Sequence, residues 1–153
     1  MSRFRLVVLT FALILPCVPC PQDVALAQWS ADPMVNTPVC VTAARQGGFG
    51  MVDDGNGGAI IVWQDLDLNT SENDLYAQRI NSDGIIQWGA GGVTICDVPG
   101  HQTVPSVARD GAGGAFVVWQ DNRSGQPDIY AQRIDSNGVV QWLGNGVPVA
   151  RIR

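Results

Sequence analysis

Beyond residue 27, the chain alternates short apolar stretches with glycine-rich and polar turns. Residues 115–120 are apolar at nearly every position, a pattern typical of a strand buried on both faces. The DGAGG segment at 110–114 supplies glycines for a tight hairpin, and Asn137-Gly138 is typical of a two-residue type I′ turn. The strands that this pattern predicts are residues 105–109, 115–120, 129–134 and 139–142. Because no stretch keeps the helical spacing of about 3.6 residues, we expect β structure throughout.

The same pattern occurs twice. DGNGGAIIVWQD at 54–65 returns as DGAGGAFVVWQD at 110–121, and DLYAQRINSDGIIQW at 74–88 returns as DIYAQRIDSNGVVQW at 128–142. The strands are nearly identical in the two copies, whereas the loop that joins the second and third strands is two residues longer in the first copy. A period of about 55 residues indicates one supersecondary unit per repeat, which needs a neighbouring unit to bury its apolar faces.

Four antiparallel strands in a meander, repeated head to tail, predict an all-β, propeller-like fold. An open β-sandwich or a stacked β array is the alternative. We expect residues 28–47 to form a partial repeat, 48–96 the first repeat, and 97–153 the second repeat with the start of a third. Closed propellers have about four to eight blades, so two units predict an incomplete ring. Either several copies assemble or further repeats complete it.

The recurring pattern carries a resemblance to a known group of proteins. DGxGGAxxVWQD, followed by D-[IL]-YAQRI and GxxQW, resembles the tandem repeats of large secreted or cell-surface bacterial proteins. The resemblance covers residues 53–142, with several motifs in the same order. It implies a propeller-like fold and a binding or adhesion scaffold, in a class whose members mostly have no assigned chemistry.

Residues 1–27 have the pattern of a secretory signal peptide. Arg3 and Arg5 give a positively charged start. Residues 6–15 are an apolar run too short to span a bilayer as a helix, and Ala-Leu-Ala at 25–27 is a cleavage site. We therefore predict an exported protein, secreted or held at the cell surface, with no membrane insertion after cleavage.

The four cysteines fall into two groups. Cys17 and Cys20 offer a lipid anchor as the alternative to free secretion, although a proline precedes each where a lipobox has a small residue. Cys40 and Cys96 occupy equivalent places in successive repeats. Equivalent positions of stacked sheets lie about 10 Å apart, which is farther than a disulfide spans. We expect two free, buried thiols.

Charge excludes some partners. The chain has 9 basic residues, all of them arginine, against 14 acidic ones, for a formal net charge of −5. Nucleic-acid backbones and anionic lipid surfaces both require a basic patch, so neither is an expected partner.

Aromatic and charged residues recur at the same strand positions. The aromatic ones are Trp63, Tyr76, Trp88, Trp119, Tyr130 and Trp142. They suit either a glycan-stacking surface or packing between blades, and their strand positions favour packing. Asp65 and Asp121 end apolar strands, where they can accept bonds from loop N–H groups. Arg79 and Arg133 of the third strands are expected to pair with those carboxylates, in a structural role.

One segment has oxygen-bearing side chains at alternate positions, as calcium loops do. Asp65, Asp67 and Asn69 are the candidate calcium ligands. Thr70 stands where a calcium loop has glycine, and Tyr76 stands where it has a bidentate carboxylate. A solvated hairpin loop without a cofactor is therefore the favoured interpretation, and calcium is the alternative.

No catalytic residues are predicted. The chain has one histidine, His101, and one glutamate, Glu72, and lacks a nucleophile-elbow pattern. We predict an exported, non-catalytic repeat scaffold that binds a protein or glycan through loops 65–73 and 121–127, where the two repeats differ. The candidate ligand-binding residues are Asp65, Asn69, Asn73, Asp121, Arg123 and Asp128. The alternatives are part of a secreted propeller-type hydrolase and a calcium-stabilised surface protein.

Overall fold

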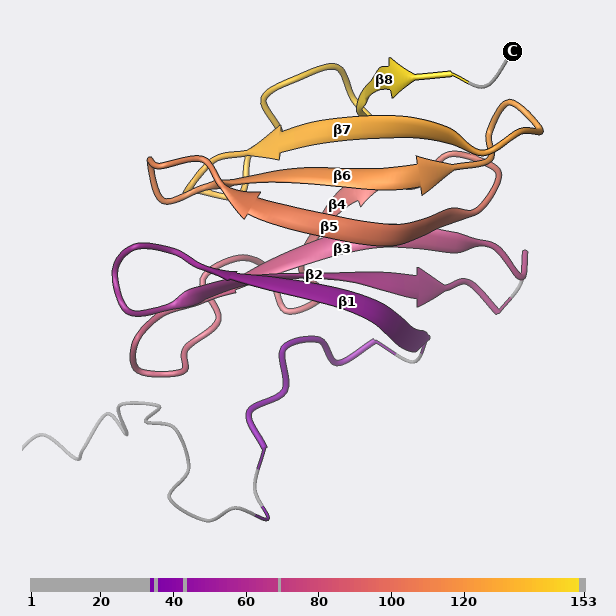
Figure 1. The fold of residues 1–153 in the computed structure, drawn as a ribbon. Coiled ribbons are helices and arrows are strands. Elements are labelled where there is room, and N and C mark those ends of the chain that lie inside the picture. The colour runs from indigo at the N-terminus through magenta and orange to yellow at the C-terminus, as the bar shows by residue number, and fades with distance from the viewer. Residues whose placement is uncertain (1–33, 35, 43, 69, 152–153) are drawn as a thin grey trace, which may run out of the picture.

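The computed structural model describes residues 34, 36–42, 44–68 and 70–151. The predicted signal peptide, residues 1–27, lies outside the described residues. No helix forms in the described part of the chain, and none there could cross a membrane. The described residues form two antiparallel sheets of four strands each, which do not close into a barrel (Figure 1). The predicted all-β, repeated meander is confirmed.

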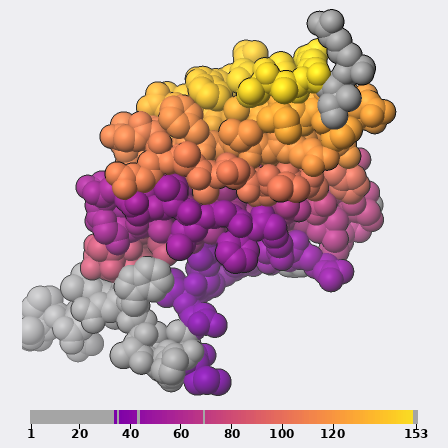
Figure 2. All heavy atoms as spheres, viewed as in Figure 1, coloured from indigo at the N-terminus to yellow at the C-terminus, as the bar shows by residue number. Residues whose placement is uncertain are grey.

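Each sheet follows the chain order, so every strand pairs with its sequence neighbours. The strands of the first sheet are β1 (Arg45–Asp53), β2 (Ala59–Leu66), β3 (Asn73–Ile80) and β4 (Val93–Cys96). Those of the second sheet are β5 (Gln102–Arg109), β6 (Ala115–Asp121), β7 (Asp128–Ile134) and β8 (Val147–Ala150). The two sheets pack directly on each other, with β5 in contact with β1, β2 and β3 (Figures 1 and 2).

The prediction of a fourth strand at residues 139–142 is wrong. That segment makes one isolated bridge, between Val140 and Ile134, and the fourth strand is the later β8. The buried side chain of Gln132 explains the difference. Its Oε1 accepts a bond from the Trp142 amide over 3.0 Å, and its Nε2 donates to the Leu143 carbonyl over 2.9 Å. These bonds replace the β ladder at this point. Gln78 does the same in the first sheet with Trp88 and Gly89.

Aspartates hold the hairpins that begin each repeat. Asp54 Oδ1 accepts bonds of 2.8 Å from the amides of Asn56 and Gly58. Burial would raise the pKa of Asp54, but these bonds and one from Arg79 outweigh it and lower the pKa. Gly58 is required because a Cβ there would lie 2.1 Å from the Ile80 carbonyl. Asp110 and Gly114 repeat the arrangement in the second sheet.

The last hairpin of the second repeat is not the predicted type I′ turn. A type I′ turn needs positive φ at both central residues. Gly138 has a φ of 83°, whereas Asn137 is not among the residues with positive φ. A Cβ at Gly138 would meet the Trp88 ring at 2.9 Å, so glycine also makes room for an aromatic ring from the other sheet.

Apolar side chains of β2, β3, β4, β6 and β7 form most of the core. The largest fully buried apolar side chains are Ile60, Val62, Leu75, Ile95, Val117, Trp119 and Ile134. Trp63 stacks on Tyr76, and Trp119 stacks on Tyr130, with 6.2 Å between ring centroids in both pairs. Most of the recurring aromatics therefore pack, as expected.

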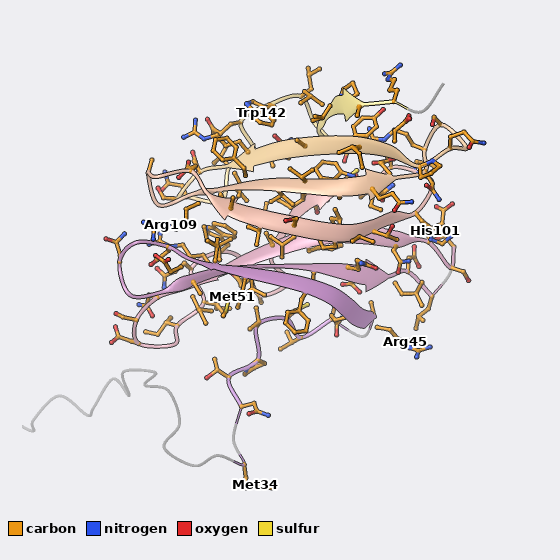
Figure 3. All side chains as sticks on the ribbon, viewed as in Figure 1. Met34, Arg45, Met51, His101, Arg109 and Trp142 are labelled. Carbon is orange, nitrogen blue, oxygen red and sulfur yellow. The ribbon has the colours of Figure 1, made fainter. Side chains whose placement is uncertain are left out.

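The two tryptophans that follow the last hairpins differ in their surroundings. Trp88 is buried between the sheets, and its Nε1 donates to the Ser136 carbonyl over 3.3 Å. Its counterpart Trp142 contacts Phe116, is 40% exposed, and lies on the side of the second sheet away from the first (Figure 3). The difference arises because only Trp88 has a neighbouring sheet against it in the described chain.

Candidate functional site

The arginines of the third strands pair with the hairpin aspartates. Arg79 Nη2 lies 2.8 Å from Asp54 Oδ2, so the expected pairing of Arg79 with Asp65 is wrong. Register is the reason: Arg79 pairs with Ile60 at the hairpin end of β2, whereas Asp65 lies opposite Asp74 at the other end. In the second sheet the expected pairing of Arg133 with Asp121 is wrong in the same way, because Arg133 pairs with Asp110.

Asp121 instead binds an arginine from its own loop. Arg123 Nε donates to Asp121 Oδ1 over 2.8 Å, and Arg123 Nη2 donates to Oδ2 over 2.5 Å. The backbone amide of Arg123 donates to Oδ1 over 2.9 Å, which confirms that this aspartate accepts a loop N–H. Trp119 Nε1 adds a bond of 2.8 Å to Oδ2. Burial would raise the pKa of Asp121, but the bonds from Arg123 and Trp119 outweigh it and lower the pKa.

The Arg123 guanidinium has three further neighbours. Its Nη2 donates to the Asn145 carbonyl over 2.8 Å and lies 3.1 Å from Cys96 Sγ. Its Cζ lies 3.9 Å from the centre of the Tyr130 ring, a cation–π contact. Because Cys96 belongs to β4, the guanidinium connects the two sheets. Burial raises the pKa of Cys96 to about 11, so this thiol is neutral at physiological pH.

The equivalent place in the first sheet is an open cavity of about 460 Å³. Residues that line it include Thr42, Asp65, Asp67, Asp74, Tyr76 and Gly91. Asp67 stands two residues after Asp65, as Arg123 stands two residues after Asp121. The first repeat therefore has a carboxylate where the second repeat has the guanidinium that fills its site.

Two buried groups of β2, Asp65 and Trp63, have fewer or longer hydrogen bonds than their counterparts in the second sheet. Asp65 accepts bonds from Thr42 Oγ1 over 3.2 Å and from Gln46 Nε2 over 3.4 Å, both at the long end of the range. Trp63 is 4% exposed, and its Nε1 has no hydrogen-bond partner among the described residues. The counterpart Trp119 donates to its aspartate.

Negative charge gathers at this end of the first sheet. Burial raises the pKa of Asp74 to about 6, and the nearby carboxylates of Asp97, Asp67, Glu72 and Asp65 add to the rise. Tyr76 is partly exposed to the cavity, and burial followed by the charge of Asp74 raises the pKa of its phenol. The site therefore combines carboxylates with an accessible aromatic ring.

The predicted calcium ligands are only partly brought together. Asp65 and Asp67 both line the cavity, while Asn69 lies outside the described residues. No three His, Cys, Asp or Glu side chains are grouped to hold a metal ion in the described ranges. Calcium binding stays the untested alternative to a loop without a cofactor.

The other predicted ligand-binding residues make contacts within the protein. Asn73 Nδ2 lies 3.4 Å from His101 Nδ1, and Asp128 Oδ2 accepts a bond of 2.9 Å from Ser124 Oγ. Asp121 and Arg123 bind each other. The second loop is thus held by its own side chains, whereas the first loop borders a cavity.

Sequence reasoning missed two groups of this cavity, Thr42 and Asp74, and favoured packing for Tyr76, whose ring is partly exposed at the cavity. A signal was present, because aligning the two loops shows arginine in one and aspartate in the other. The free thiols Cys40 and Cys96 also take equivalent positions, next to Gly91 and Asn145 respectively.

Comparison with protein families, curated proteins and solved structures found no match to this chain.

Proposed function

We propose that this protein is an exported, non-catalytic repeat scaffold that binds a partner through the loop between β2 and β3. One observation carries the proposal. Two nearly identical sheets differ at equivalent loops, where one site is filled by Arg123 and the other is open beside Tyr76. Loops on a rigid scaffold are where binding sites are usually placed, and this cavity has the size of a small-ligand site.

The surroundings of the single histidine support a non-catalytic role. His101 is exposed at one end of β5 and contacts the amide of Asn73 (Figure 3). A nucleophile-and-base mechanism would require a Ser or Cys side chain within hydrogen-bond reach of that ring. The carboxylates and the aromatic ring of the cavity are instead groups that hold and orient a ligand.

A loop exchange tests the binding role. Residues 66–73 of the full chain are replaced by NRSGQP, the sequence of residues 122–127, which brings an arginine to the cavity. Wild-type and exchanged proteins are applied to arrays of bacterial and host polysaccharides and of random peptides. We expect wild-type binding to at least one probe class, lost on exchange, with an unchanged β-type circular dichroism spectrum. Binding retained by the exchanged protein, or no binding by either, would overturn the proposal.

Export is tested separately. Residues 1–47 are fused to alkaline phosphatase, which is active only after export from a bacterial cell. We expect phosphatase activity from this fusion and none from a fusion in which Leu9 and Leu13 are both replaced by arginine. Equal activity of the two fusions would contradict export by this segment.

The side of the second sheet that faces away from the first sheet favours a second copy of this chain as its protein partner. Trp142, Leu143 and Val149 are exposed there. Within one chain, the equivalent Trp88 packs on the last hairpin of the next sheet. We therefore propose that Trp142 packs on the hairpin at residues 81–84 of a second copy, head to tail. Light scattering should show an oligomer that Trp142→Glu dissociates into folded monomers, and a monomeric wild type would contradict this assembly.

A further inference from the structure

We propose that the cavity beside Tyr76 binds the guanidinium group of an arginine side chain, in the place that Arg123 takes in the second repeat. This inference rests on the binding role proposed above and names its ligand. The second repeat serves as an internal template, since it contains the same site with its cation in place.

The Arg123 site shows which groups bind a guanidinium at this place in a repeat. Asp121 accepts two N–H bonds from Arg123, one on each carboxylate oxygen, and Arg123 Cζ lies over the Tyr130 ring at 3.9 Å from its centroid. The Asn145 carbonyl accepts the second N–H bond of Nη2, and Cys96 Sγ lies 3.1 Å from the same nitrogen. A carboxylate fork with an aromatic face selects a planar guanidinium over a compact ammonium.

Each of these four anchors has a counterpart at the cavity. Asp65 corresponds to Asp121, Tyr76 to Tyr130, Gly91 to Asn145, and Cys40 to Cys96. Asp65, Tyr76 and Gly91 line the cavity directly, and Cys40 Sγ lies 3.9 Å from the Gly91 carbonyl. The anchors are thus kept, while the residue that would fill them within the chain is replaced by Asp67.

Three features of the first sheet match a site that lacks its cation. Tyr76 is partly exposed, whereas Tyr130 beneath Arg123 is only 6% exposed. Asp65 accepts two long bonds in place of the short fork at Asp121. Trp63 Nε1 is buried without a partner among the described residues, although Trp119 Nε1 bonds to the carboxylate that binds arginine. The absence of a guanidinium accounts for the exposure of Tyr76 and for the missing short bonds at Asp65.

Charge selects the same ligand. Asp65, Asp67 and Asp74 all line the cavity, and no basic side chain is among the described residues that line it. A metal ion would need oxygen ligands converging at about 2.3–2.6 Å, as calcium does, and the described carboxylates form no such group. An arginine within a peptide fits better than free arginine, because the α-carboxylate of free arginine would face the same aspartates.

The experiment uses the full chain and four small probes in calorimetric titrations. N-acetyl-L-arginine amide represents a peptide arginine, and free L-arginine represents the amino acid. N-acetyl-L-citrulline amide has nearly the same shape without charge, and N-acetyl-L-lysine amide has the charge without the plane. We expect one arginine amide per chain, with citrulline and lysine amides at least tenfold weaker and free arginine weaker than the amide. Citrulline or lysine amide binding as well as the arginine amide would overturn the inference.

Substitutions at the cavity test whether the arginine amide binds there. Tyr76→Leu and Asp65→Asn should each weaken arginine amide binding at least tenfold, provided circular dichroism shows the wild-type fold. Asp67→Arg should fill the cavity as Arg123 fills its counterpart, abolishing binding and raising the melting temperature. Arginine amide binding that survives Asp67→Arg would overturn the inference even if the first two variants fail to fold.

The template itself is tested by chemical rescue. Arg123→Gly should melt at a lower temperature than wild type, and millimolar methylguanidinium should raise its melting temperature more than the same concentration of methylammonium. No such difference would contradict the reading of this site as a guanidinium receptor. The two proposals can fail separately. If the wild type binds an array probe and the loop exchange abolishes that binding, but no guanidinium probe binds, only the ligand class is refuted. If the wild type binds nothing on the arrays, the proposed function is refuted.

Discussion

Arg79 links the two sheets: its guanidinium lies 2.8 Å from the buried Asp54 carboxylate, and its Nη1 donates to the Ser136 carbonyl of the second sheet over 3.1 Å. Trp88 Nε1 donates to the same carbonyl. A charged pair that holds the first hairpin of one sheet therefore also fixes the last hairpin of the next. Because the pair recurs as Arg133 and Asp110, the chain contains its own control for this contact.

Replacing Arg79 should destabilise the fold more than replacing Arg133. Arg79→Met leaves the buried Asp54 carboxylate without its ion pair, which costs about 3 kcal/mol in free energy of unfolding. Arg133 is more exposed, at 35% of its side chain against 18% for Arg79, and its described ion pair lies within its own sheet. Urea unfolding of Arg79→Met and Arg133→Met measures both losses. Equal losses would show that the link to the second sheet adds nothing.

Gln78 should contribute to the stability of the fold, because its side chain bonds to backbone groups in place of a β ladder. Its Oε1 accepts bonds from the amides of Arg79 and Trp88, and its Nε2 donates to the Gly89 carbonyl over 2.7 Å. Gln78→Leu leaves these groups unsatisfied, and we expect a loss of about 2–4 kcal/mol in free energy of unfolding. The exposed side chain of Gln87 donates to the nearby Ile85 carbonyl, and its backbone bond to the Arg79 carbonyl does not depend on the side chain, so Gln87→Leu should change stability by less than about 0.5 kcal/mol. Similar losses from the two variants in urea unfolding would contradict this role.

The two tryptophans after the last hairpins should respond differently to truncation. Trp88→Ala opens a cavity between the sheets and should cost about 3–5 kcal/mol. Trp142→Ala should cost about 1 kcal/mol when measured in solution dilute enough for the protein to be monomeric, because its ring is already 40% exposed. Chemical denaturation with tryptophan fluorescence measures both. A large loss from Trp142→Ala in the monomer would show that its contact with Phe116 carries more stability than its exposure indicates.

Asp74 should make the protein less stable at neutral pH than in mild acid. Its pKa rises from 3.8 to about 6 on folding, first through burial and then through neighbouring carboxylates. A raised carboxyl pKa contributes stability that is present below pH 3.8 and is lost as the pH rises through about 6. Asp74→Asn should therefore stabilise the protein at pH 7.5, on the order of 1 kcal/mol after solvent screening, and by much less at pH 4.5. Melting curves at both pH values check this, and a gain that does not depend on pH would contradict it.

Much of the fold follows from local features of the chain. The two DGxGG segments predict hairpins because an aspartate and glycines satisfy the turn within a few residues, and the structure has them at Asp54 and Asp110. The fourth strand was predicted at residues 139–142 because that segment is apolar and follows a turn. The structure places β8 later, since Gln132 binds the amide of Trp142 and the carbonyl of Leu143. Periodicity does not reveal a side chain that replaces a β ladder.

Only the loop residues of the candidate site could be predicted from the sequence. The sequence predicts loop 65–73 as a ligand-binding loop that includes Asp65, and it gives Asp65 and Asp67 as calcium ligands only in the alternative interpretation. The cavity also needs Thr42 from before β1 and Gly91 from before β4. These segments are far apart in the chain, so their approach depends on sheet packing and leaves no local pattern.

Two equivalent four-stranded units can be predicted from the residues alone, because strand periodicity and turn chemistry act over a few residues and recur with the repeat. The pairing of Arg79 with Asp54, the burial of Trp88 but not of Trp142, and the opening of one of two equivalent sites emerge from packing. Those outcomes depend on register and on which surface packs against each residue. The equivalent loops also differ in sequence and length, with Arg123 filling one site and Asp67 bordering the open one.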